Sequence, residues 1–531
     1  MADGHYFTSF MVTIMQKNIY LYDTTLRDGA QGHAVTFSLQ DKIEIVKKLD
    51  EVGMHFIEAG NPISNPRDFE LFEKLKSMPL KSTRLVAFGS TCRVGADAQE
   101  DEGLKMLCTL FCPCVAIVGK SSAFHVREVL KTTPEENLRM IASSIAVLKN
   151  AGKTVFFDAE HFFDGYFDDS AYALSTLKAA ADAGADYLVL CDTNGGTLPE
   201  DVRNVVDAVA PLYGGKLGIH AHNDCGTAVA CSLTAVRRGA TVVQGSVNGL
   251  GERCGNADLT AVIPNLVLKI GIPCFPQLSR ITELSQFVSS VANLTHDIRM
   301  PYVGEAAFVH KGGMHIDGVM KNPRSFEHVL PEEVGNSRAF ALSDLSGRAL
   351  VLPKLQKVEQ SLTRESPEVE MLYNKLKQME FEGYSFEDAE DSFLLMVKKA
   401  LGKYRPFYEA LDFQVLCQRP EDVTYTMATI KVKVGDKVEI TAAEGDGPVN
   451  ALDCALRKAL TVFYPQLSKL RLTDFKVRVV NLSGTASSVR VFIRSTDGKR
   501  DFGTVGVDPS ILQAAWIALT DSVDAFLESE Q

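Results

Sequence analysis

Short apolar runs recur along the first half of the chain, with amphipathic stretches between them. Eight runs begin near residues 18, 56, 84, 115, 154, 187, 216 and 242, the first being "NIYLYDTTL" and the last "VVQGSVNGLG". A spacing of roughly 30 residues, with a helical pattern after each run, is typical of an α/β protein with a (β/α)8 TIM barrel. A doubly wound open sheet is the alternative, but eight regular units without a GxGxxG motif favour the closed barrel.

The pattern changes twice after the eighth run. Residues 276–403 read as charged amphipathic helices and loops, whereas from about residue 404 runs such as "TYTMATIKVKVG" and "SSVRVFIRST" alternate like half-buried strands. Two helical patterns follow these strands. The segments "AAEGDGPVN" and "GTVGVDPS" each lead into one of them, and taken alone we interpret both as glycine turns with helix caps. The chain is therefore expected to comprise an N-terminal tail (1–16), a barrel (17–275), helical linker subdomains (276–403) and an α+β domain (404–531) with an internal pseudo-repeat.

Composition narrows the class of function. The net charge of −12 argues against general binding to nucleic acid or to an anionic membrane surface, but leaves small anionic ligands open. No apolar run reaches the roughly 18 residues of a membrane helix, and the first residues lack the basic start and cleavage site of a secretory signal. The 11 cysteines are odd in number and include no CxxC pair, as expected of reduced thiols in a cytoplasmic protein.

Polar residues collect where the predicted strands end. In a barrel of this class, the carboxyl ends of the strands meet at one mouth, where active sites lie. A surface ion pair in a turn would account only for the neighbours Arg27 and Asp28. Each polar group left unpaired would cost about 1–3 kcal/mol, so a purely structural barrel has no reason to collect so many. The residues at these ends are Arg27, Asp28, Glu58, Lys120, Glu160, Asp192, Thr193, His220, His222 and Asn256.

The sharpest signal among these residues is the HxH pair of His220 and His222. Alternate residues of a strand share one face, so both imidazoles point to the same side. Strands seven, eight and one are neighbours in a closed barrel, which allows Asp28 and Asn256 to approach the same point. Two neutral imidazoles, a carboxylate and an amide oxygen suit a divalent metal (Mg²⁺, Mn²⁺ or Zn²⁺) with positions left open for substrate. A hydrogen-bonded polar plug is the alternative.

Three motifs carry a resemblance to a known family. "YDTTLRDGAQG", "HAHNDCGTAVACS" and "NGLGERCGNADL" resemble the signatures of the 2-isopropylmalate synthase, homocitrate synthase and citramalate synthase family, barrel enzymes that condense acetyl-CoA with a 2-oxo acid. The likeness spans nearly the whole chain, and the last domain resembles the family's amino-acid-sensing regulatory domain. "GAQG" in place of "GEQSPG", together with "DAEHFFDGY", is most similar to the citramalate synthase branch.

The resemblance implies a metal-dependent acyltransferase that joins acetyl-CoA and pyruvate to give (R)-citramalate and CoA in isoleucine biosynthesis. A larger acceptor, as in 2-isopropylmalate synthase or homocitrate synthase, is the alternative, because several loops form the walls of the pocket. A metal-dependent acyl-CoA lyase is less favoured. In "GLGERCGNA", Cys254 lacks the flanking glycines of the lyase loop, and the lyases lack a sensor domain.

The resemblance also implies roles at the barrel mouth. The expected metal ligands are Asp28, His220, His222 and Asn256. Arg27 is expected to contact the 2-oxo acid and to stabilise the oxyanion that forms on its keto oxygen. Thr193 matches the contact with the substrate carboxylate.

Further residues are expected to act beside this group. Glu160 matches an essential acidic residue that takes a proton from the acetyl methyl group or orients the base that does so. Asp158 is expected to line the oxo-acid pocket, and Glu58 to hold Arg27 or to form a plain barrel ion pair. Lys120 and Lys311 could meet CoA phosphates or be solvated.

His315, in "HKGGMHIDG", matches a histidine that the family brings to the site from the helical subdomain, often of the partner subunit. Its implied role is proton transfer or thioester hydrolysis, and a surface loop histidine is the alternative. Phe326 stands where many members have tyrosine, so any role of that hydroxyl is absent or passes to a neighbour such as His328. Residues 404–531 are expected to bind a feedback amino acid, isoleucine or leucine, and to support a homodimer.

Overall fold

The structure is a computed structural model that describes residues 18–340, 352, 354–363, 365–418, 425–480 and 487–530. The N-terminal tail expected over residues 1–16 lies outside the described residues. The chain divides into two compact units. The first unit runs to Phe308 and includes Val329–Arg338, and the second contains Val309–His328 and the residues from Ala339 onwards. The predicted domain boundaries stay predictions.

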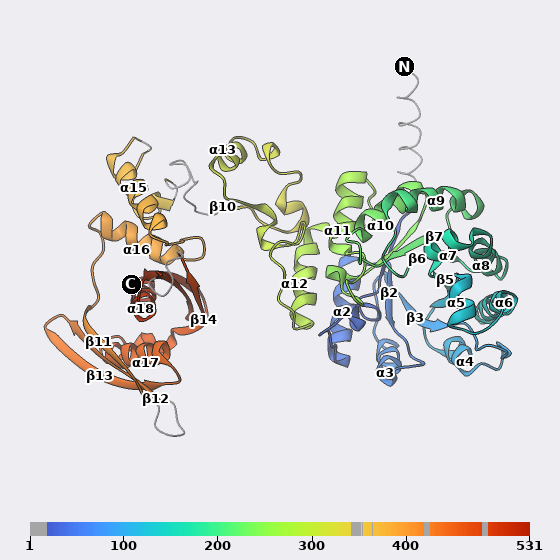
Figure 1. The fold of residues 1–531 in the computed structure, drawn as a ribbon, viewed down its shortest axis with the longest axis horizontal. Coiled ribbons are helices and arrows are strands. Elements are labelled where there is room, and N and C mark those ends of the chain that lie inside the picture. Colours follow the sequence, from blue (N-terminus) through green and yellow to red (C-terminus); the bar gives the residue numbers. More distant parts are fainter. Residues whose placement is uncertain are drawn as a thin grey trace, which may run out of the picture. The chain divides into compact units, whose positions relative to one another are not determined.

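The first unit contains the predicted barrel. Its eight strands are all parallel to their neighbours, and β1 pairs with both β2 and β8, which closes the sheet (Figure 1). The strands are β1 (Tyr20–Asp23), β2 (Phe56–Gly60), β3 (Arg84–Ser90), β4 (Cys114–Lys120), β5 (Thr154–Glu160), β6 (Tyr187–Asp192), β7 (Leu217–Ala221) and β8 (Val242–Gly245).

Helices surround this sheet and shield its outer face. Ser38 caps the start of α2: its side chain accepts a hydrogen bond from the Asp41 N–H, and the Asp41 side chain accepts one from the Ser38 N–H. Gly53, with φ +92°, follows the last residue of the helix and ends it. The helices of the first unit are α2 (Leu39–Val52), α3 (Pro66–Leu75), α4 (Glu102–Thr109), α5 (Ala123–Glu128), α6 (Pro134–Asn150), α7 (Phe162–Asp168), α8 (Ser170–Asp182), α9 (Pro199–Tyr213), α10 (Ala228–Arg238), α11 (Leu259–Pro264) and α12 (Ile281–Val291). Short helical turns are η1 (Gly29–Gln31), η2 (Val247–Gly249), η3 (Asn265–Ile270), η4 (Leu278–Arg280), η5 (Glu305–Phe308) and η7 (Pro331–Val334).

Aromatic side chains fill the interior of the barrel below its mouth. Tyr22, Phe56 and Phe156 are buried there, and their rings meet at centroid distances of 5.0–6.1 Å. This packed layer closes the barrel from below, so the polar groups at the carboxyl ends of the strands sit on a rigid apolar floor.

The second unit begins with helical segments and ends in two similar halves. In one half α17 covers the antiparallel sheet β11-β12-β13, and in the other α18 covers the sheet β14-β15-β16 (Figure 1). This arrangement confirms the expected internal pseudo-repeat. The elements are β9 (Val309–His310), α13 (Gly313–Lys321), η6 (Pro323–Ser325), β10 (Ala339–Phe340), α15 (Pro367–Phe381), α16 (Glu390–Ala400), β11 (Glu409–Gln418), β12 (Tyr425–Val434), β13 (Lys437–Gly445), α17 (Pro448–Thr461), η8 (Pro465–Lys469), β14 (Arg471–Val479), β15 (Val489–Thr496), β16 (Asp501–Asp508) and α18 (Ile511–Ser529).

The glycine turn expected in "GTVGVDPS" is wrong, whereas the expected helix cap is present, because the Ser510 side chain accepts a hydrogen bond from the Gln513 backbone N–H at the start of α18. The segment belongs largely to β16, which pairs with β15 along its whole length. Gly503 and Gly506 are needed for close packing instead of a turn. A Cβ atom at Gly503 would lie 2.1 Å from the Asp388 carbonyl oxygen, and one at Gly506 would lie 2.0 Å from that of Ala514.

Among the described residues, no helix combines the length and apolar content needed to cross a membrane.

Candidate active site at the mouth of the barrel

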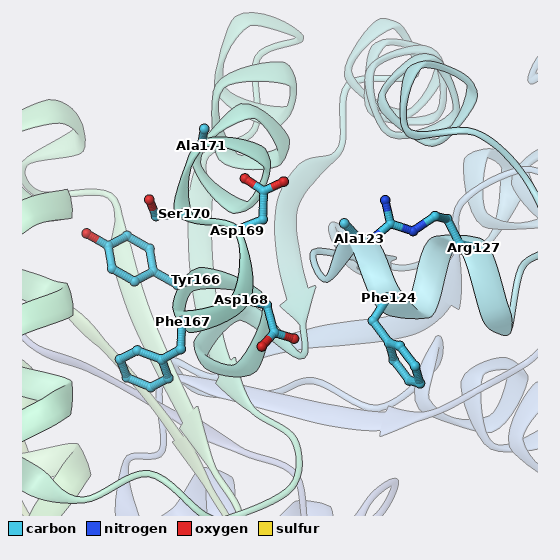
Figure 2. A pocket seen from close by; sticks show the side chains of 9 residues that line it. All are labelled: Ala123, Phe124, Arg127, Tyr166, Phe167, Asp168, Asp169, Ser170 and Ala171. Atoms are coloured by element: carbon cyan, nitrogen blue, oxygen red, sulfur yellow. The ribbon is translucent and has the colours of Figure 1, made fainter.

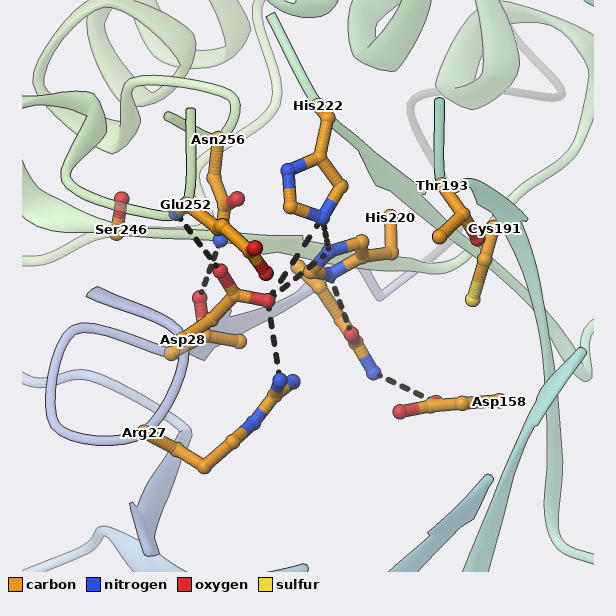
Figure 3. A network of polar contacts seen from close by, with 12 residues as sticks. Arg27, Asp28, Asp158, Cys191, Thr193, His220, His222, Ser246, Glu252 and Asn256 are labelled. Carbon is orange, nitrogen blue, oxygen red and sulfur yellow. Dashed lines mark hydrogen bonds and ion pairs between the residues drawn. The ribbon is translucent and has the colours of Figure 1, made fainter. Parts of the chain in front are cut away.

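The side chains of the predicted metal ligands, which come from the ends of β1, β7 and β8 and the loops after them, lie close together at the mouth of the barrel (Figure 3). Asp28 lies in the turn after β1, His220 lies on β7, and His222 follows the end of β7. Asn256 pairs with His222 through an isolated backbone bridge, which places the loop after β8 against the end of β7. All four side chains are buried. The barrel closure therefore brings together residues that are more than 200 positions apart in sequence.

The geometry of this group fits a cation. The Oδ2 atom of Asp28 lies 3.7 Å from Nε2 of His220 and 3.8 Å from Nε2 of His222, and the two Nε2 atoms are 3.3 Å apart. One donor atom from each of the three residues lies within 4.8 Å of the others. The Asn256 amide nitrogen donates to Thr24, but its Oδ1 atom is buried without a hydrogen-bond partner among the described residues. Such an orphaned oxygen is satisfied when it ligates a cation.

The protonation states also favour cation binding. Burial and the neighbouring His222 lower the pKa of His220 to about 3, and burial lowers the pKa of His222. Burial raises the pKa of Asp28, but the Arg27 guanidinium and the two imidazoles outweigh it, so the pKa is below its usual value. Near neutral pH the group consists of a carboxylate and two neutral imidazoles, the forms that bind a metal.

Arg27 is fixed beside this group by buried partners. Its Nε donates to Glu58 Oε2 at 2.6 Å, and its Nη1 donates to Asp28 Oδ2 at 3.0 Å. The guanidinium carbon lies 4.1 Å from the centre of the Phe88 ring. Glu58 is fully buried and also accepts a hydrogen bond from the Tyr22 hydroxyl at 2.8 Å. The structure therefore supports the expectation that Glu58 holds Arg27 in place.

The remaining predicted residues lie at the ends of β4, β5 and β6. Lys120 forms an ion pair with Glu160 at 2.5 Å, so in this structure its ammonium group meets a carboxylate. The Thr193 hydroxyl accepts a hydrogen bond from the His161 backbone N–H at 2.8 Å. Burial and the nearby Glu58 carboxylate raise the pKa of Asp158 to about 8.

A small pocket of about 160 Å³ opens over these residues. It is lined by Arg27, Asp28, Gln31, Phe88, Val118, Asp158, Glu160, Cys191, Thr193, His220, His222, Glu252 and Arg253. The structure thus places the predicted 2-oxo acid contacts Arg27, Asp158 and Thr193 at one pocket, together with Glu160. A larger pocket of about 570 Å³ lies between α5 and α7 and contains none of the predicted site residues (Figure 2).

His315 belongs to the second unit, on α13. Its ring stacks on the Phe326 ring with 4.1 Å between centroids and 19° between planes. Phe326 thus makes an apolar ring contact with His315. Lys311, in the same unit, forms an ion pair with Glu387 at 2.8 Å. The role of His315 at a barrel mouth stays a prediction.

Two site residues were missed in the sequence. Gln244 on β8 is fully buried and bonds to both His220 and Asp158. Arg253 makes two hydrogen bonds to the Asp224 carboxylate and one to the Thr193 carbonyl oxygen at 2.8 Å, which ties together three loops of the mouth. The available signal for Gln244 was a single polar residue in an apolar run, and for Arg253 its place in the "GLGERCGNA" motif.

Comparison with known proteins gives matches over both units. The model of the HMGL-like family matches residues 18–288, the model described as "Homocitrate synthase post-HMGL domain-like" matches residues 302–383, and the model described as "LeuA allosteric (dimerisation) domain" matches residues 387–527. The barrel and its continuation are therefore followed by a domain of an allosteric type.

Three relatives match over nearly their whole lengths. The (R)-citramalate synthase of Aquifex aeolicus is 48% identical, covering 96% of this chain and 98% of the relative. The (R)-citramalate synthase of Geobacter sulfurreducens is 47% identical, with coverage of 97% and 98%. The 2-isopropylmalate synthase of Methanocaldococcus jannaschii is only 27% identical, with coverage of 97% and 95%.

Proposed function

Because the chain belongs to the family of the (R)-citramalate synthases, which are condensing acyltransferases, we propose that it joins acetyl-CoA and pyruvate to give (R)-citramalate and CoA. The main support for this proposal is the sequence identity of 47–48%, over nearly the whole chain, to relatives that are named (R)-citramalate synthase. The site residues support it, because each has a role in this reaction.

Asp28, His220, His222 and Asn256 would hold a divalent cation, Mg²⁺, Mn²⁺ or Zn²⁺. Their contribution is one carboxylate and two neutral imidazoles whose donor atoms lie close together, with the Asn256 amide oxygen, which has no hydrogen-bond partner among the described residues. When bound, the cation supplies a Lewis acid and a template for the keto oxygen and carboxylate of the 2-oxo acid.

The condensation begins at the methyl group of acetyl-CoA. Glu160 accepts a proton from the methyl carbon, whose electron pair then forms a carbon–carbon bond to the keto carbon of pyruvate. The negative charge that develops on the keto oxygen is stabilised by Arg27, which Glu58 and the Phe88 ring hold in a fixed orientation. This oxygen then takes up a proton to become the tertiary hydroxyl group, and Glu160 gives up the proton that it accepted, so that the step balances. Thr193 contacts the carboxylate of the acid, and Asp158 lines the pocket wall.

The second half of the reaction releases CoA. A water molecule adds to the thioester carbonyl carbon, the carbon–sulfur bond breaks, and the sulfur leaves as the CoA thiol after it takes a proton. We assign proton transfer in this half to His315, contributed by a second-unit helix of the same subunit or of its partner. The ring of Phe326 would orient His315 by stacking.

Residues 404–531 are proposed to sense isoleucine and to support a homodimer. The match to an allosteric dimerisation domain supports this assignment. Citramalate leads towards isoleucine, so an amino acid at the end of that route is the logical inhibitor, with leucine as the alternative.

The test is a thiol-release assay with acetyl-CoA against pyruvate, 2-oxobutyrate, 2-oxoisovalerate and 2-oxoglutarate. Pyruvate is expected to give the highest kcat/KM. Each extra methylene group is worth only about 1–3 kcal/mol in a fitted pocket, so weaker turnover of 2-oxobutyrate is compatible with the proposal. A higher kcat/KM for 2-oxoisovalerate would reassign the enzyme to 2-isopropylmalate synthesis.

A further inference from the structure

Gln244 lies between His220, one of the proposed metal ligands, and Asp158 of the acid pocket. The residue is fully buried on β8, which pairs with β1 on one side and with β7, the strand of His220, on the other. Its Oε1 atom lies 2.9 Å from Nδ1 of His220, and its Nε2 donates to Asp158 Oδ1 at 3.1 Å. The amide therefore bridges a proposed cation ligand and a residue of the acid pocket.

These contacts restrict the form of the His220 ring. A neutral imidazole carries one N–H, and the nitrogen that binds a cation must be the other one. Nε2 of His220 faces Asp28 and His222 at 3.7 and 3.3 Å, whereas Nδ1 faces the Gln244 amide. If Nδ1 carries the hydrogen, it can donate to the amide oxygen, and the amide NH₂ group is left to donate to Asp158. Both hydrogen bonds of the bridge are then made, and Nε2 is left free to bind a cation.

His222 offers a contrast within the same site. Its Nδ1 atom is buried and has no hydrogen-bond partner among the described residues. The protein therefore fixes one of the two imidazoles through a side-chain amide and leaves the other without such a fixation. Within the part of the chain that the structure describes, Nδ1 of His220 is held by Gln244.

We propose that Gln244 is a positioning residue that holds His220 in the tautomer with a free Nε2 and, through the same amide, orients Asp158 in the acid pocket. The inference rests on the proposed metal-dependent function, but it concerns metal binding and ring tautomer, whichever 2-oxo acid the enzyme prefers. Partners that orient metal-ligating histidines in this way commonly change metal affinity 10–100-fold when removed.

The test measures Mn²⁺ binding to the metal-stripped full-length protein by calorimetry. Gln244→Met has a similar length but no amide, and it is expected to weaken Mn²⁺ binding about 10–100-fold. Gln244→Glu keeps an oxygen that accepts from His220, so its affinity is expected to stay within about threefold of wild type, while its KM for pyruvate rises because a carboxyl group replaces the donor to Asp158. The control is Asn137→Leu, which removes another buried amide, on α6, that donates to the Lys120 backbone carbonyl oxygen and to the Tyr172 hydroxyl. This variant is expected to lower the melting temperature without changing Mn²⁺ affinity.

A second measurement uses the unaltered protein. The ¹⁵N shifts of His220, assigned by comparison with His220→Gln, are expected to report a hydrogen on Nδ1 in the metal-free protein. A hydrogen on Nε2 would overturn the proposal even if Gln244→Met does not fold. Mn²⁺ affinity of Gln244→Met within twofold of wild type, or equal losses in Gln244→Met and Gln244→Glu, would overturn it as well.

Discussion

Replacing Arg27 by lysine separates the chemical role of this residue from its structural role. Arg27 donates from Nε to the buried Glu58 and from Nη1 to Asp28, at 2.6 and 3.0 Å. Lysine keeps the positive charge, but its single ammonium group lacks the planar fork that spans both carboxylates. The variant therefore loses at least one charged hydrogen bond.

The expected magnitudes follow from this loss. A hydrogen bond to a charged group contributes about 1.5–3 kcal/mol, and Glu58 is fully buried, so water cannot replace the missing donor. At about 2–4 °C per kcal/mol for a domain of this size, the melting temperature should fall by about 3–12 °C. Loss of a preorganised donor to an oxyanion costs about 10²–10³ in turnover. Arg27→Lys is thus expected to remain folded at 25 °C with kcat reduced by about that factor.

The assay follows CoA thiol release at saturating acetyl-CoA and pyruvate, well below the melting transition. The matched control is Arg84→Lys. Arg84 stands at the start of β3, far along the strand from the mouth, and donates to Thr154 at 2.7 Å. The control should keep kcat within about twofold of wild type. The reasoning would be refuted by an Arg27→Lys enzyme with kcat within twofold of wild type, or by a loss of activity no larger than its unfolded fraction.

Three further results are expected. Removal of divalent metal with a chelator should abolish thiol release and Mn²⁺ should restore it, whereas Asp28→Asn should stay inactive at the same Mn²⁺ concentration; full turnover by the stripped enzyme would contradict the ligand set. Saturating isoleucine should weaken substrate binding or slow turnover by about 5- to 150-fold, the range given by coupling of about 1–3 kcal/mol, and enzyme lacking residues 404–531 should not respond; if neither isoleucine nor leucine changes the rate or melting temperature of the intact protein, the domain serves assembly alone. Burial raises the pKa of Asp524 to about 7, so the contribution of its protonated form to stability is fully present below about pH 4 and is lost as the pH rises to 7. The unfolding free energy of Asp524→Asn, measured relative to wild type, should therefore increase between pH 4.5 and 7 and then level off. A difference that does not change with pH would disprove the raised pKa.

Much of the barrel could be predicted because its signals are local. Each strand is a short apolar run, and the turns and helix ends between runs are marked by residues such as Ser38 and Gly53. The β16 strand was missed because Gly503 and Gly506 suggest a turn in sequence, whereas in the fold they allow the backbone of neighbouring elements to approach. That requirement arises from segments distant in sequence, such as the carbonyl group of Asp388.

The same distinction applies to the site. The sequence was enough to select the expected metal ligands, because alternate residues of a strand share one face and neighbouring strands of the barrel end at the same mouth. These ligands are Asp28, His220, His222 and Asn256. The partners of Gln244 lie 24 and 86 residues away, on β7 and β5, so no spacing rule connects them. The role of this buried glutamine follows only from the closed sheet, in which it lies between His220 and Asp158.

The most direct measurement of the central claim is a one-pot competition. Enzyme with Mn²⁺ and limiting acetyl-CoA is given pyruvate and 2-oxoisovalerate at equal concentrations, and the products are separated by chiral chromatography and identified by mass. The ratio of products equals the ratio of kcat/KM for the two acids. We predict (R)-citramalate as the main product, in at least about tenfold excess. A majority of 2-isopropylmalate, or no condensation product at all, would contradict the account.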